Sequence, residues 1–253
     1  MEGFLETSNG RLSYRHIEGK KNLNVVFMHG TLSDKNASKS LFLEQTCREI
    51  GVSFTAFDFL GHGKSYGVYT DGTIGKWLQN ALDIIDRVTH GKLILVGSSM
   101  GGWIMLLSAL ACPERISGLI GMAAAPDFTV DLWNSFSETQ KNDIKTKGVI
   151  YTPNGWTEEG DPWTFELFND AEKYLLLDKK TLDIVSPVTL IHGGKDDCVP
   201  VKTSFRIMNA VKSDNVKVIV LKNSGHRLSE ATDLDILRSV LELHVKAAED
   251  DVA

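Results

Sequence analysis

Short apolar runs alternate with helical patterns along most of the chain, and this alternation limits the possible folds more than any other feature. The apolar runs predict buried strands at 24–28, 52–58, 92–97, 116–123, 188–192 and 216–221. Apolar residues at helical spacing predict helices at 36–50, 73–89, 99–112 and 230–248. Strands that alternate with helices form parallel βαβ units, so the sequence predicts an α/β fold built on a largely parallel sheet.

Two segments depart from this alternation. Residues 11–17 alternate polar and apolar side chains, which predicts an antiparallel edge strand. Residues 127–183 contain many aromatic side chains among acids and lysines, with no strong strand pattern. We therefore expect a single domain, 1–253, with 127–183 as a small helical cap insertion over the carboxyl edge of the sheet, where open α/β sheets bind ligands. Its aromatic side chains suit either a lipophilic substrate group or the insertion's own core.

Charge and cysteine content exclude several classes of function. The net charge is −6, and the basic residues are scattered or paired, which argues against nucleic acid as a partner. Cys47, Cys112 and Cys198 lie far apart in the sequence, so neither a disulfide framework nor a cysteine-based zinc site is predicted. No metal or organic cofactor is implied, and the oligomeric state is not indicated.

The amino terminus predicts the compartment. It carries acidic residues early and lacks a basic segment followed by an apolar run, so we predict no signal peptide. No apolar stretch reaches the roughly 18 residues that a transmembrane helix needs. We therefore predict a cytoplasmic bacterial enzyme, with a processed organelle protein as the alternative, since it would look similar once its transit peptide was removed.

A G-x-S-x-G motif joins the predicted strand 92–97 to the predicted helix 99–112. A strand that turns directly into a helix holds the central residue, Ser99, in a strained conformation. Side chains at Gly97 and Gly101 would collide with neighbouring backbone, which explains the two glycines. The motif predicts that Ser99 is a nucleophile at a helix amino terminus. Ser99 as an ordinary helix N-cap is the alternative, but an N-cap does not need the flanking glycines.

A serine nucleophile needs a histidine base and an acid that orients it, in the order serine, acid, histidine for this arrangement. His226 follows the predicted strand 216–221, whereas His244 lies within the terminal helix, so we predict His226 as the base. Asp196 follows strand 188–192 in a G-x-x-D-x-x-V-P pattern and is the predicted acid. The competing Asp197 is expected to cap the loop or the next helix, and Cys198 to be a buried thiol.

The loop after strand 24–28 should supply part of an oxyanion hole, together with the backbone N–H of Met100. Gly30 allows close approach of the substrate, and the N–H of Thr31 is the predicted second donor, with Leu32 as the alternative. His29 is expected to hydrogen-bond within this loop rather than to take part in the chemistry.

Several motifs in register resemble those of the α/β-hydrolase family: His29–Gly30, Phe57–Ser65, Gly97–Gly101, Gly194–Pro200 and Gly225–His226. The resemblance implies a mostly parallel eight-stranded sheet flanked by helices. The segment Gly97–Trp103, with the end of the insertion at Glu172–Asp178, is similar to the branch that contains the mitochondrial acyl-protein thioesterase and acyl-glucuronide esterase and their bacterial relatives. That likeness implies cleavage of carboxylic esters or thioesters, including S-acyl groups such as palmitoyl.

The predicted activity is acyl transfer from a small-molecule or acylated substrate to water through an acyl-Ser99 intermediate. A C–C bond hydrolase, a lipase-like esterase and an amidase on the same triad are alternatives. Dehalogenase and epoxide hydrolase chemistry is disfavoured, because those relatives carry aspartate where this chain has Ser99. A ligand-sensing protein on a hydrolase scaffold is the alternative from another class.

Overall fold

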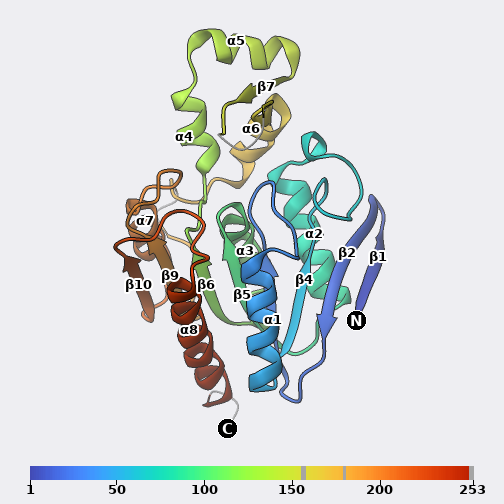
Figure 1. Ribbon diagram of the computed structural model, residues 1–253, viewed down its shortest axis with the longest axis vertical. Helices are drawn as coiled ribbons and strands as arrows, with labels where there is room; N and C mark the ends of the chain where they lie inside the picture. Colours follow the sequence, from blue (N-terminus) through green and yellow to red (C-terminus); the bar gives the residue numbers. More distant parts are fainter. Residues whose placement is uncertain (155–157, 179–180, 251–253) are drawn as a thin grey trace.

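Eight strands form one mixed sheet through the centre of the protein (Figure 1). The computed structural model describes residues 1–154, 158–178 and 181–250. Trp156 of the insertion and the terminal residues 251–253 lie outside the described residues. The strands of this sheet are β1 (Glu2–Thr7), β2 (Gly10–Ile17), β3 (Leu23–Met28), β4 (Ser53–Phe57), β5 (Lys92–Ser98), β6 (Ile116–Met122), β9 (Val188–Gly193) and β10 (Val216–Leu221).

The strand order is β1-β2-β4-β3-β5-β6-β9-β10, and the six strands from β4 to β10 are parallel. This order confirms the predicted mostly parallel sheet. The prediction of residues 11–17 as an edge strand was wrong, because β2 pairs antiparallel with both β1 and β4. The edge is β1, a strand that the apolar pattern did not predict because only Leu5 of its six residues is buried.

Helices cover both faces of the sheet. The helices of the core are α1 (Ser38–Ile50), α2 (Ile74–Arg87), α3 (Met100–Ala111), α7 (Lys202–Ala210) and α8 (Ala231–Asp250), with short 3-10 helices η1 (Tyr69–Asp71) and η2 (Pro113–Arg115). Apolar residues of α2, α3 and α7 pack in one core cluster, and those of α1 and α8 pack in another. Strand β5 serves both clusters, since Leu93 and Leu95 face the first while Ile94 and Val96 face the second.

The insertion lies between β6 and β9 and projects beyond the carboxyl ends of the parallel strands (Figure 1). Its elements are α4 (Phe128–Ser135), α5 (Glu138–Lys147), β7 (Val149–Thr152), β8 (Asp161–Thr164), α6 (Phe165–Ala171) and η3 (Glu172–Tyr174). Strands β7 and β8 pair antiparallel, and the sequence pattern did not predict this small sheet. Among the described helices, none combines the length and the apolar character that crossing a bilayer requires.

Candidate active site

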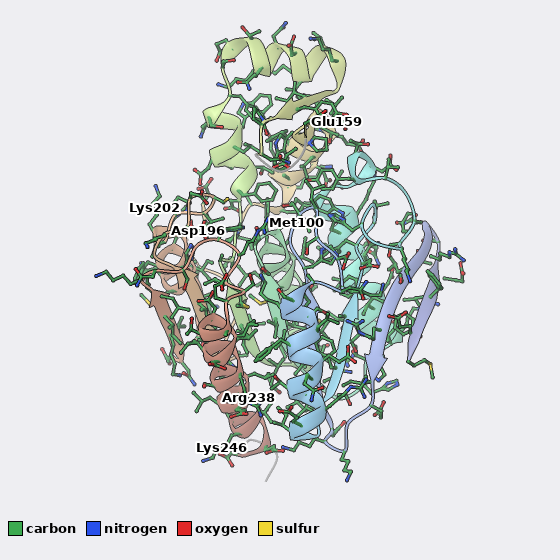
Figure 2. All side chains as sticks on the ribbon, in the orientation of Figure 1. Met100, Glu159, Asp196, Lys202, Arg238 and Lys246 are labelled. Carbon is green, nitrogen blue, oxygen red and sulfur yellow. The ribbon has the colours of Figure 1, made fainter. Side chains whose placement is uncertain are left out.

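The predicted nucleophile, acid and base all lie at one end of the sheet. Ser99 follows β5, Asp196 follows β9 and His226 follows β10. Because these strands are parallel, their carboxyl ends meet at the same edge. Asp196 and Met100, the residue next to Ser99, lie at the end of the sheet nearest the insertion (Figure 2).

The turn from β5 into α3 has the geometry that the glycine motif predicts. Ser99 has φ 54° and ψ −121°, a strained combination for a residue with a side chain. A Cβ on Gly97 would lie 2.4 Å from the carbonyl oxygen of Gly101. A Cβ on Gly101 would lie 2.1 Å from the carbonyl oxygen of Met28. Both glycines are therefore required by backbone contacts, and the predicted reason for their presence is confirmed.

Ser99, His226 and Asp196 form a continuous chain of hydrogen bonds. The distance from Ser99 Oγ to His226 Nε2 is 3.1 Å, and His226 Nδ1 lies 2.9 Å from Asp196 Oδ2. The carboxylate of Asp196 can only accept a hydrogen bond, so the imidazole of His226 carries its proton on Nδ1. Its Nε2 atom is then free to accept a hydrogen bond from the hydroxyl of Ser99. The arrangement can therefore transfer a proton from the hydroxyl to the imidazole.

The carboxylate of Asp196 is held from several sides. Its side chain is buried, and Oδ1 accepts hydrogen bonds from the backbone N–H groups of Cys198, at 2.9 Å, and Val199, at 2.8 Å. The Nε2 atom of buried His192 lies 3.2 Å from Oδ2. Burial raises the pKa of Asp196, but hydrogen bonds from His192, His226 and the backbone outweigh burial and hold this pKa well below its usual range. Asp196 is therefore ionised at neutral pH.

Two backbone N–H groups are free beside the nucleophile. Within the part of the chain that the structure describes, neither the N–H of Thr31 nor that of Met100 donates a hydrogen bond. The alternative donor, the N–H of Leu32, is already used, because it donates to Nε2 of His62 at 3.1 Å. A Cβ on Gly30 would lie only 3.1 Å from Ser99 Cβ, so this loop passes close to the nucleophile. The free N–H groups of Thr31 and Met100 are therefore more suitable donors to an oxyanion than the N–H of Leu32.

The other buried histidines have structural contacts. His29 donates from Nδ1 to the carbonyl of Gly30 at 2.8 Å and accepts at Nε2 from the N–H of Phe59 at 3.2 Å. Burial, with a smaller contribution from His62, lowers the pKa of His29 to about 3, so this side chain is neutral. His244 packs inside the protein, with Nε2 2.9 Å from Thr189 Oγ1.

Two expectations for the acid loop were wrong. Cys198 is exposed rather than buried, because it lies in a loop whose neighbouring residues Lys195 and Asp197 are also exposed. For Asp197, which we expected to cap the loop or the next helix, the helix alternative is wrong, because the N-cap residue of α7 is Val201 and has no side-chain hydrogen bond. Instead, the carboxylate of Asp197 lies 3.5 Å from the sulfur of Cys198.

Aromatic side chains of the insertion pack on one another. Trp133 contacts Phe136, Phe165 and Phe168, with ring centroids 5.2 to 6.4 Å apart. A second set links the insertion to the core, because Phe128 lies between Trp163 and Trp103 of α3. These contacts favour the interpretation that the aromatics form the insertion's own core.

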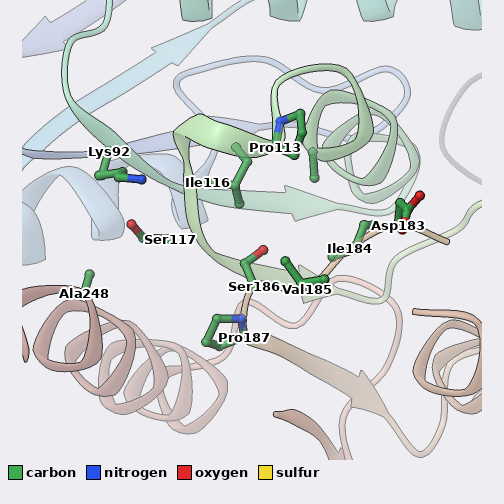
Figure 3. Close-up of a pocket in the computed structure, with 11 residues that line it drawn as sticks. Lys92, Pro113, Ile116, Ser117, Asp183, Ile184, Val185, Ser186, Pro187 and Ala248 are labelled. Atoms are coloured by element: carbon green, nitrogen blue, oxygen red, sulfur yellow. The ribbon is translucent and has the colours of Figure 1, made fainter. Parts of the chain in front are cut away.

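The structure also contains a pocket of about 270 Å³, whose lining residues are drawn in Figure 3. It is lined by Lys92 and Ile116, the first residues of β5 and β6, and by Pro187, which precedes β9. It therefore opens at the amino ends of the parallel strands, whereas Ser99, Asp196 and His226 follow their carboxyl ends.

Comparison with known proteins identifies the family. The sequence profile of the alpha/beta hydrolase family matches residues 25–235. The chain belongs to the α/β-hydrolase family. Mitochondrial palmitoyl-protein thioesterase ABHD10 of Homo sapiens is 38% identical over 227 residues, which cover 89% of this chain and 74% of that protein. The corresponding protein of Bos taurus gives the same identity and coverage.

Solved structures of α/β-hydrolases show the same fold. Mouse alpha/beta hydrolase domain-containing protein 10 has a TM-score of 0.90 and 33% identity, with 100% of both chains covered. A putative hydrolase from Agrobacterium vitis S4 has a TM-score of 0.92 and 27% identity, with 96% of this chain and 98% of that chain covered. The predicted family, and its likeness to the acyl thioesterase branch, are confirmed.

Sequence reasoning missed three side chains around this α/β-hydrolase site. His192 contacts the acid, His62 holds the loop that carries Thr31, and the Cys198 thiol lies beside Asp196 and His226. His62 stands between two glycines in the Phe57–Ser65 motif of the family resemblance, and His192 lies two positions before the Gly194–Pro200 motif. That position was the only available signal, since their contacts depend on how the loops fold.

Proposed function

We propose that the protein is a serine hydrolase that cleaves carboxylic esters and thioesters, with Ser99 as nucleophile, His226 as base and Asp196 as acid. The observation that carries this proposal is the hydrogen-bonded chain from Ser99 Oγ through His226 to the buried carboxylate of Asp196. An ordinary helix N-cap needs neither this chain nor a strained backbone at the serine.

The reaction follows from the positions of these groups. Ser99 Oγ bonds to the acyl carbon while its proton passes to His226 Nε2, and Asp196 stabilises the resulting imidazolium. The N–H groups of Thr31 and Met100 hold the oxyanion, a contribution of about 3 kcal/mol per donor in comparable sites. The C–S or C–O bond then breaks, and His226 returns the proton to the leaving thiolate or alkoxide. Water attacks the acyl-Ser99 ester by the same route and releases the acid.

We propose long-chain S-acyl groups on proteins or small thiols as the substrate class. The named relatives at 38% identity are palmitoyl-protein thioesterases, and the chain matches 74% of their length. We also propose that residues 127–183 form a cap over the acyl site, which their place beyond the carboxyl ends of the strands supports (Figure 1).

A fluorophosphonate probe and a substrate panel test the mechanism. Wild type, Ser99→Ala and His226→Ala are labelled with the probe, and hydrolysis of p-nitrophenyl esters and acyl-CoA thioesters of rising chain length is measured. We expect labelling of wild type at Ser99 only, and a fall in kcat of about 10⁴-fold or more in either variant. Ser98→Ala is the matched control, because this neighbouring hydroxyl has no place in the hydrogen-bonded chain.

The results separate the proposed function from its alternatives. Unlabelled wild type with no turnover of any ester or thioester would contradict the hydrolase proposal and favour a ligand-sensing protein. Labelling of Ser99 with turnover confined to amides or to C–C bonds would retain the triad and reject the proposed substrates.

The compartment also stays a proposal. The relatives at 38% identity are named as mitochondrial, which supports an organelle location. A cytoplasmic location is the alternative proposal. Fractionation of cells that express the tagged protein separates these two locations.

A further inference from the structure

Three side chains with different ligand atoms meet beside the nucleophile. Ligand atoms of Asp196, Cys198 and His226 all lie within 4.8 Å of one another. They offer an oxygen, a sulfur and a nitrogen, the three atom types that bind Zn²⁺ in proteins. The spacing of cysteines along the sequence did not indicate this group, because His226 comes from a different loop.

We propose that Asp196, Cys198 and His226 form an inhibitory Zn²⁺ site, in which the ion replaces the proton between His226 and Asp196. In a tetrahedral zinc site, ligand atoms are about 3.3 to 3.6 Å apart, given bonds of about 2.0 to 2.3 Å. His226 Nδ1 and Asp196 Oδ2 are 2.9 Å apart, so they must separate by about 0.4 Å. This change is small for a histidine whose side chain is 22% exposed.

The third ligand can reach the ion without a change in the loop. The backbone of Cys198 is fixed, because its N–H donates to Asp196 Oδ1. Its thiol is exposed and, among the described residues, makes only a long contact of 3.5 Å with Asp197, so the side chain can rotate toward His226. The negative charges of Asp196 and Asp197 favour a cation here. Three protein ligands leave one tetrahedral position for water.

The acid also has the outer contact that is typical of metal-binding carboxylates. His192 lies 3.2 Å from Asp196 Oδ2, and its Nδ1 lies 2.8 Å from Ser204 Oγ. Outer hydrogen bonds of this kind orient metal ligands and raise affinity. The carboxylate therefore remains oriented when the ion displaces the hydrogen bond from His226.

Zinc at this position would block the base. When Zn²⁺ binds Nδ1, the proton of the neutral imidazole moves to Nε2, and the thiol proton of Cys198 is released to solvent. Nε2 then faces Ser99 Oγ, 3.1 Å away, as a donor and has no lone pair to accept the hydroxyl proton. Inhibition should therefore be reversible by a chelator. This inhibition depends on the proposed function, whereas the binding of zinc does not.

Titration with zinc chloride tests the site. Protein freed of metal by a chelator is titrated by calorimetry, and hydrolysis of a p-nitrophenyl ester is measured in parallel. We expect one zinc ion per chain and a loss of affinity of about tenfold or more in Cys198→Ser. Cys112→Ser is the matched control, because this half-buried thiol bonds the carbonyl of Ser108 and lies outside the group. The rate of ester hydrolysis of each variant in zinc is divided by the rate of the same variant in chelator, so that inhibition is compared on the same scale for every variant.

Cobalt replaces zinc in the second measurement. Co²⁺ bound to a thiolate gives a sulfur-to-metal charge-transfer absorption, which we expect in wild type and Cys112→Ser but not in Cys198→Ser. Unchanged zinc affinity in Cys198→Ser, or no such absorption in wild type, would overturn the proposed site. Both results are independent of catalysis, so an inactive protein would contradict the proposed function without affecting this test.

Discussion

Gly30 leaves space in front of Ser99, the proposed nucleophile, and filling that space should reduce activity. A Cβ there would lie 3.1 Å from Ser99 Cβ and 3.7 Å from Ser99 Oγ. In Gly30→Ala we expect kcat/KM for ester hydrolysis to fall about 10- to 100-fold, because the acyl carbon is displaced from the serine. The rate of fluorophosphonate labelling should fall in parallel, while the melting temperature changes little. Labelling at the wild-type rate would show that substrates do not approach across Gly30.

Backbone constraints made parts of the site predictable from the sequence. The elbow could be predicted because glycine at positions 97 and 101 is a requirement of the local chain, as the 2.4 Å and 2.1 Å contacts of their added Cβ atoms show. The contact between His192 and Asp196 could not, since it depends on a loop path that leads from Gly193 to Val199. The exposure of Cys198 has the same origin: apolar character favours burial, but the loop path places this residue at the surface.

Among the elements, buried strands were predictable and the periphery was not. Every residue of β3 and β4 is buried, so apolar side chains make up most of each strand. Strand β1 has one buried residue, and the hairpin of β7 and β8 has short strands with mixed exposure, so neither carries a hydrophobic signal. These strands are held by hydrogen bonds to a neighbouring strand, and the hydrophobic pattern of a single strand does not predict such pairing.

Helix α8 contributes a buried histidine that should make stability depend on pH. Burial lowers the pKa of His244 to about 4, below its ordinary value of 6.5. The unfolded chain therefore binds a proton that the folded chain does not, and stability is lost as the pH falls through 6.5 toward 4. Between pH 6.5 and 4.5 we expect this side chain to account for a loss of about 2 kcal/mol in the free energy of unfolding.

Urea denaturation of His244→Gln at the two pH values checks this contribution. Glutamine can keep the hydrogen bond to Thr189 without titrating, so its stability should fall less than that of wild type over the same range. His90→Gln, a change at an exposed histidine, is the control and should follow wild type. Equal losses in wild type and His244→Gln would place the acid sensitivity elsewhere, for example at buried His29.

At the scale of the whole molecule, a few polar contacts join the insertion to the core. Asp127, at the start of the insertion, accepts hydrogen bonds from the N–H groups of Leu176 and Leu177 at its end, at 2.8 and 2.7 Å. Trp103 of α3 donates from Nε1 to the carbonyl of Tyr174 at 3.1 Å. The carboxylate of Asp127 therefore holds the two crossing segments together at the base of the insertion.

Replacing Asp127 by asparagine should loosen the insertion while the sheet remains intact. Asparagine tolerates the left-handed φ of 61° at this position. However, its amide NH₂ group would replace one carboxylate oxygen, and a donor would then face the backbone N–H that this oxygen accepts from in wild type. The lost bond is worth about 1.5 to 3 kcal/mol. We expect hydrogen exchange within 128–176 to become about tenfold faster or more, while exchange in β5 and β6 is unchanged.

Asp131→Asn, on the exposed surface of α4, is the control. Equal acceleration in the sheet would mean that Asp127 stabilises the whole domain, since the insertion would then open only when the core unfolds.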